Sequence, residues 1–116
     1  MSIILTKIPD ISQYSKYIQS VQLSSDITVF IIYKTLFRSD DVLVDLYLNE
    51  ITDNSIITSG KVLVNNSVII QPRFNDGFKY SVYCYSLDSI SSGLNKYNAH
   101  KFHLQFTNTN NTKWLG

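Results

Sequence analysis

The chain has 116 residues, a net charge of +1, 44% hydrophobic residues and 16% charged residues. This length suits a single domain that buries its own core. The ten basic residues are scattered and include only two arginines, which excludes the cationic stripe that nucleic-acid binding needs. No apolar run is long enough for a membrane span or a signal peptide, so we expect a protein made and folded in a cytoplasm, without nucleic-acid or membrane partners.

The composition predicts an all-β fold. Ala99 is the only alanine, Glu50 the only glutamate and Met1 the only methionine, whereas Ile, Val, Thr, Tyr and Phe are abundant. Apolar segments recur about every ten residues, which is typical of a sandwich or a small barrel. We expect a single-domain β-sandwich or partly open barrel of seven or eight mainly antiparallel strands.

The first strands are expected at residues 3–8, 18–23 and 27–36, and residues 11–17 are ambiguous between a loop and an irregular edge. The segment 27–36, ITVFIIYKTL, is apolar on both parities. That pattern predicts a central strand that is covered on both sides.

Residues 41–50, DVLVDLYLNE, place three carboxylates on the next strand. Alternation directs Val44 and Leu46 to one face and Asp41, Asp45 and Tyr47 to the other. Asp41 and Asp45 are then roughly 13 Å apart, whereas paired glycosidase carboxylates lie about 5–9.5 Å apart. We therefore interpret Asp45 as a polar group that awaits a donor, on this chain or on another subunit, and as a candidate partner-binding residue.

The segment IITSGKVLVNNSVII carries two turn signals, Ser59-Gly60 and Asn65-Asn66. Asparagine tolerates positive φ, so we expect Asn65-Asn66 to close a tight hairpin between its flanking strands. Pro72 ends the second of these strands, because proline cannot donate to a sheet ladder.

Residues 78–87, FKYSVYCYSL, form a long aromatic strand. Alternation places Tyr83 and Tyr85 on one face and Tyr80, Val82 and Cys84 on the other. If one face forms the core, the two tyrosines offer an adhesive strip for a protein partner or a sugar, unless a second layer covers them. Cys84 is the single cysteine and is expected to be a buried, unreactive thiol.

Residues 88–99 lack a clear period and could form a loop or a short helix, of which the loop is favoured, and 100–106 form a last strand. His100 and His103 have opposite parity on a strand, so they do not make a zinc site without further ligands. The sequence has no glycine-rich phosphate loop and no nucleophile elbow. We expect no cofactor, no metal and no enzymatic activity.

The β domain is expected to span residues 1–107, followed by a polar tail over 108–116. This tail ends in an apolar pair, Trp114 and Leu115, which has no evident place in the core. The pair is a candidate docking anchor for a neighbouring protein.

Three segments together resemble the small baseplate plug proteins of contractile-tailed bacteriophages, of the cyanophage type. The matching residues are the run from Ile4 to Pro9, the VDLY of 44–47, and an I-x-x-G-x-x-L-V-N pattern from Ile57 to Asn65. The resemblance spans roughly residues 3–87.

This resemblance implies a structural virion protein, present in several copies in a symmetric assembly at the tail tip. Its implied partners are the hub, spike and wedge proteins of the baseplate, and the implied mechanism is interface burial with edge-strand pairing. An alternative function is a carbohydrate-binding β-sandwich module, such as a receptor-binding tip, that would stack sugars on Tyr83 and Tyr85.

Overall fold

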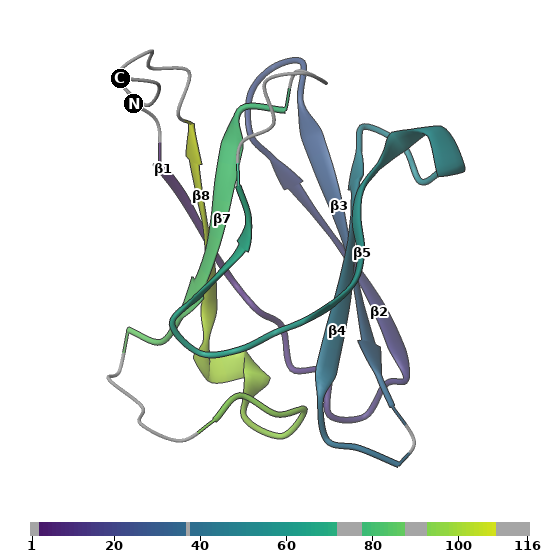
Figure 1. Ribbon diagram of the computed structural model, residues 1–116, viewed down its shortest axis with the longest axis vertical. Coiled ribbons are helices and arrows are strands. Elements are labelled where there is room, and N and C mark those ends of the chain that lie inside the picture. Colours follow the sequence, from purple (N-terminus) through teal and green to yellow (C-terminus); the bar gives the residue numbers. More distant parts are fainter. Residues whose placement is uncertain (1–2, 37, 72–77, 88–92, 109–116) are drawn as a thin grey trace.

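The computed structural model describes residues 3–36, 38–71, 78–87 and 93–108, which fold into two packed four-stranded antiparallel sheets (Figure 1). This arrangement confirms the predicted all-β class, and its architecture is a sandwich. The elements are β1 (Ile3–Lys7), β2 (Lys16–Gln22), β3 (Thr28–Thr35), β4 (Val42–Leu48), η1 (Asp53–Ser55), β5 (Ile56–Val62), β6 (Ser67–Ile70), β7 (Tyr80–Tyr85), η2 (Ala99–Lys101) and β8 (His103–Asn108). No helix in these ranges is long and apolar enough to cross a membrane.

One sheet has the strand order β2-β3-β4-β5 and the other the order β1-β8-β7-β6. The chain therefore crosses between the sheets after β1 and again after β5. The second crossing occurs at Asn65-Asn66, so the predicted hairpin at this pair is wrong. Asn66 does adopt a positive φ of 58°, and the Ser67 hydroxyl donates to the Val64 carbonyl over 2.6 Å. The turn chemistry was predicted correctly, but the turn joins two sheets.

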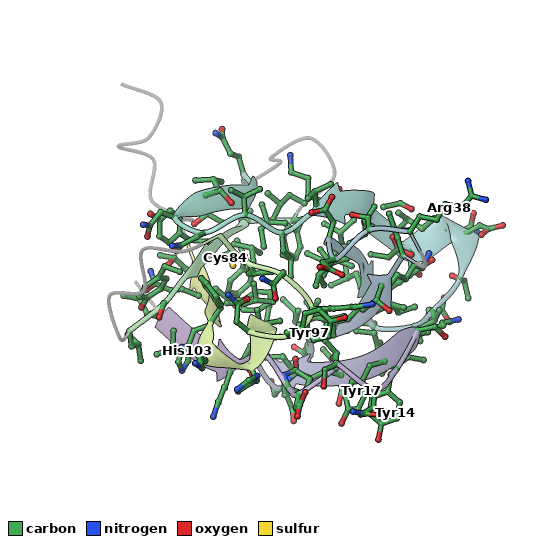
Figure 2. The ribbon with its side chains drawn as sticks, turned by 90° about the horizontal axis from the view of Figure 1, so that it is seen from below. Tyr14, Tyr17, Arg38, Cys84, Tyr97 and His103 are labelled. Atoms are coloured by element: carbon green, nitrogen blue, oxygen red, sulfur yellow. The ribbon has the colours of Figure 1, made fainter. Side chains whose placement is uncertain are left out.

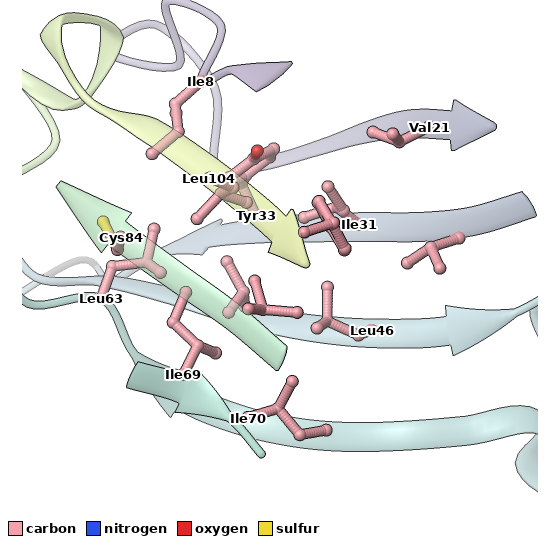
Figure 3. Close-up of a cluster of buried hydrophobic side chains, with 14 of the residues drawn as sticks. Ile8, Val21, Ile31, Tyr33, Leu46, Leu63, Ile69, Ile70, Cys84 and Leu104 are labelled. Atoms are coloured by element: carbon pink, nitrogen blue, oxygen red, sulfur yellow. The ribbon is translucent and has the colours of Figure 1, made fainter. Parts of the chain in front are cut away.

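The core lies between the two sheets, where strands from both contribute large side chains. Figure 3 shows Ile31, Leu46, Ile69 and Leu104, from four different strands, converging in this space. Alternation explains the set, because every second residue of a strand points to the same face. Phe102, Leu104 and Phe106 are fully buried.

Strand β3 lies inside its sheet, as predicted, but the prediction that it is covered on both sides is wrong. The described part of the chain forms two layers only, and Phe30 and Lys34 on the outward side are half-exposed. Ile32 is buried on that outward side between its cross-strand partners Ile18 and Asp45. Burial there comes from neighbouring side chains of the same sheet.

A glutamine closes the side of the sandwich where β1 and β2 form the two sheet edges. The Gln19 amide donates to the Lys7 carbonyl over 3.2 Å and thereby joins β2 to β1. The hydroxyl of buried Tyr33 donates to the Gln19 Oε1 atom over 2.7 Å. These bonds satisfy the polar end of a core tyrosine and link the two sheets.

Candidate functional site

Tyr83 and Tyr85 lie on the outward face of β7, and the predicted parity of this strand is confirmed. Tyr80, Val82 and Cys84 point into the core and are buried, whereas Tyr83 and Tyr85 are half-buried. The two tyrosine rings are 5.5 Å apart between centroids and are tilted by 40°. No third layer covers this face in the described ranges.

The strand register extends this surface across the whole sheet. Cross-strand partners share a face, and the pairing runs from Leu5 on β1 through Gln105 and Tyr83 to Val68 on β6. Leu5 is 43% exposed and Val68 46% exposed. We call Leu5, Gln105, Tyr83, Val68 and Tyr85 together the tyrosine face.

Polar side chains of the tyrosine face are bonded to one another. The Tyr85 hydroxyl donates to the Gln105 Oε1 atom over 3.1 Å. The Gln105 amide in turn donates to the Thr107 hydroxyl, also over 3.1 Å. These hydrogen bonds fix the Gln105 side chain. The groups that remain able to contact a partner are therefore mainly the apolar side chains of this face.

Leu5 and Val68 were not identified as site residues from the sequence. Each belongs to an edge strand that is far from Tyr83 along the chain, and only the register brings them beside it. The alternation within residues 3–7 would have placed Leu5 on one face of its strand, but it does not show which strand lies beside it.

Asp45 is outward-facing as predicted, yet it is 2% exposed, and its partners lie in the same chain. Its carboxylate accepts a 2.7 Å hydrogen bond from the Gly60 amide and a 3.2 Å bond from the Ser59 hydroxyl. Its second oxygen lies 2.5 Å from the Lys34 ammonium. No donor from another subunit is needed to satisfy this group.

The Asp45 contacts explain an irregularity in β5. The sequence suggests a turn at Ser59-Gly60, but β5 runs continuously from Ile56 to Val62, so that expectation is wrong. Gly60 has a φ of +66°, and the register with β4 shifts where Asp45 faces it. The chain makes a β-bulge there, with the Gly60 amide directed at the carboxylate. The VDLY and I-x-x-G segments therefore contact each other.

The environment of Asp45 favours its charged form. Burial by itself raises the pKa of Asp45, but the hydrogen bonds from Lys34, Gly60 and Ser59 together with the Lys34 charge outweigh burial and hold the pKa below its usual value. The same pairing raises the pKa of Lys34. Asp45 is therefore a structural carboxylate that orders the bulge.

The other residues considered from the sequence are the apolar pair of the tail and the two histidines. Trp114 and Leu115 fall outside the described residues. His100 belongs to η2 and His103 begins β8, so the predicted strand start at residue 100 is wrong and strand parity does not relate the two histidines. Within the described ranges, no three His, Cys, Asp or Glu side chains gather closely enough to hold a metal ion.

Cys84 is fully buried, as predicted, and belongs to the buried cluster shown in Figure 3. Burial raises the pKa of its thiol to about 12. The thiolate needed for nucleophilic chemistry is therefore strongly disfavoured near neutral pH.

Comparison of the chain with protein-family models, with curated proteins and with solved structures finds no match.

Proposed function

We propose that this chain is a structural subunit of a phage tail baseplate that packs its tyrosine face against hub and spike proteins. The observation that supports it is an uncovered surface of one sheet, to which β1, β6 and β7 contribute apolar and aromatic side chains and β8 contributes Gln105. Half-exposed tyrosines beside aliphatic side chains are typical of the central part of protein interfaces. The resemblance to baseplate plug proteins points to the same kind of partner.

The energetics of this face suit a contact that forms within a larger assembly. Leu5 and Val68 already have about half of their surface covered. Burying the rest contributes about 1 kcal/mol for each side chain, and the tyrosines contribute a similar or larger amount. A few such contacts give only modest affinity for a single copy. In a symmetric assembly, several copies bind together, and the overall avidity is much higher.

Co-expression with the hub and spike proteins of the same phage tests this function. The wild-type chain should co-purify with one of them, and the double variant Leu5→Ser/Tyr83→Ser should bind at least tenfold more weakly. Ile18→Ser is the matched control, because Ile18 is 50% exposed on the outward face of the other sheet. Binding to neither protein, or equal loss in the control, would refute the proposal.

Sugar binding is the second candidate, and the Tyr83–Tyr85 ring pair is the observation in its favour. Stacking on a pyranose needs aromatic faces together with free polar groups beside them. The rings are tilted by 40°, and the neighbouring Gln105 is already bonded to Tyr85 and Thr107. These features favour a protein partner over a sugar. Binding of the isolated chain to a glycan array, lost in Tyr83→Ser, would reverse this preference.

A further inference from the structure

A cavity of about 360 Å³ opens at the end of the sandwich where β4 passes into the loop that leads to η1. Its volume lies at the lower end of the range for ligand sites. It shares no residue with the tyrosine face. The lining residues are Leu48, Asn49, Glu50, Asn54, Ser55, Ile56, Ile57 and Phe78.

Hydrogen bonds hold the loop at the rim of this cavity in place. Asn49 has a φ of +65°, its amide donates to the Thr28 carbonyl over 2.7 Å, and its side-chain oxygen accepts from the Thr28 amide over 2.8 Å. Further along the loop, the Ser55 amide donates to the Thr52 carbonyl over 3.0 Å. A site fixed in this way loses little conformational entropy when a ligand binds.

Glu50 places a carboxylate at the rim with most of its bonding capacity unused. It accepts one long hydrogen bond, 3.4 Å from the Ser55 hydroxyl. Within the described ranges, neither ion pair involves Glu50. An ionised carboxylate has about four acceptor positions, so this one can receive a bidentate donor.

The inner wall of the cavity is apolar. Ile57 and Phe78 are nearly fully buried and Leu48 is half-buried, so they form a wall behind the carboxylate. A ligand that fits needs an apolar stem to lie against this wall and a cationic head to reach Glu50. Arginine has both, and its planar guanidinium matches a carboxylate through two parallel hydrogen bonds.

We propose that this cavity binds an arginine side chain of a partner protein, with the stem against Leu48 and Ile57 and the guanidinium on Glu50. The proposal rests on the cavity alone and does not depend on the tyrosine face or on the identity of the assembly. Charge complementarity makes the cavity specific for arginine, because a neutral side chain of the same shape would leave Glu50 without a cationic partner.

Titration of the ¹⁵N-labelled chain with N-acetyl-arginine-N-methylamide tests the site by amide chemical shifts. Shifts should concentrate on residues 48–57, with a dissociation constant on the order of millimolar for so small a probe. The citrulline analogue is neutral and nearly isosteric, and it should bind at least tenfold more weakly. Glu50→Gln should cause a similar loss, whereas Asp53→Asn, an exposed carboxylate outside the cavity lining, should change affinity less than threefold.

Equal binding of the arginine and citrulline probes, or an unchanged affinity in Glu50→Gln, would overturn the proposal. Glu50 is exposed, so this variant should keep the wild-type spectrum elsewhere and can be tested as a folded protein. A tyrosine-face variant that loses its partner should still bind the probe, so the two proposals can fail separately.

The chain's own Arg38 provides a test of where the arginine comes from. Arg38 is exposed in the β3–β4 turn, at the opposite end of the sheet from the cavity, and projects away from the fold in Figure 2. Concentration-dependent shifts of residues 48–57 that disappear in Arg38→Gln would assign the arginine to a second copy and overturn its assignment to another protein. Amide chemical shifts of residues 48–57 that do not change with protein concentration would exclude a second copy as the source of the arginine and support another protein as the partner.

Discussion

Replacing Asp45 by asparagine should lower the stability of the domain by about 2 kcal/mol at neutral pH. The change keeps the shape of the side chain and an oxygen that can accept from the Gly60 amide, but it removes the charge. Hydrogen bonds to a charged group contribute about 1.5–3 kcal/mol, and the Lys34 pair adds little because that lysine side chain is 45% exposed. For 116 residues, a loss of this size corresponds to a fall of about 8 °C in the melting temperature.

The pH dependence of this difference tests its cause. The folded-state pKa of Asp45 lies below its unfolded value. Its contribution is therefore complete above an unfolded pKa of about 3.9 and disappears as the pH falls through the folded pKa. Urea unfolding followed by circular dichroism should show a gap of about 2 kcal/mol between wild type and Asp45→Asn at pH 7, and this gap should narrow as the pH is lowered below about 3.9.

Lys34→Met is the matched control for this experiment, because it removes the cation but keeps the bonds from Gly60 and Ser59 to Asp45. It should cost only about 0.5–1 kcal/mol, as expected for a pair with one partly exposed member. If Asp45→Asn is as stable as wild type at pH 7, or if the gap stays constant on acidification, the carboxylate does not order the bulge as we argue.

Three further changes probe the fold. Gly60→Ala should lower the free energy of unfolding in urea by about 1 kcal/mol, because Gly60 has a φ of +66°, which an L-residue adopts only with strain. Gly93→Ala is the control and should be neutral, because Gly93 has no positive φ and an added Cβ meets nothing within 4 Å at either position. Cys84 should react with a thiol reagent only at the rate of unfolding, and fast labelling of the native protein would contradict its burial. Tyr33→Phe should cost about 1 kcal/mol by removing the bond to Gln19, and unchanged thermal stability would show that this bond contributes nothing.

Local alternation was enough to predict which side chains of a strand share a face. Val44 and Leu46 share a face as expected, as do Val82 and Cys84, and both pairs are buried, because the two-residue period is a property of each strand alone. The parity of Tyr83 and Tyr85 followed from the same rule. This part of the candidate site could be predicted because it lies on one strand.

Features that depend on two distant segments were not predictable in this way. Turn chemistry at Asn66 fixes a backbone angle, but it does not decide which sheet the next strand joins. A glycine such as Gly60 is typical of turns and of β-bulges alike, and only its contact with Asp45 shows that a bulge forms. Leu5 and Val68 join the tyrosine face through register, which no short sequence window contains.

The edges of the two sheets explain why the faces are the better candidates for partner binding. A partner strand can add to a free edge, but β5 carries a bulge at Gly60 and an exposed lysine, Lys61, both of which discourage regular pairing. Strand β6 has only four residues, and Gln19 links the edge strands β1 and β2 on the other side. Edge-strand pairing, which the resemblance implies, is thus less favoured by this geometry than burial of the tyrosine face. An assembly built from such subunits would gain its specificity from side-chain contacts, and the bulge held by Asp45 would keep neighbouring copies from joining through β5.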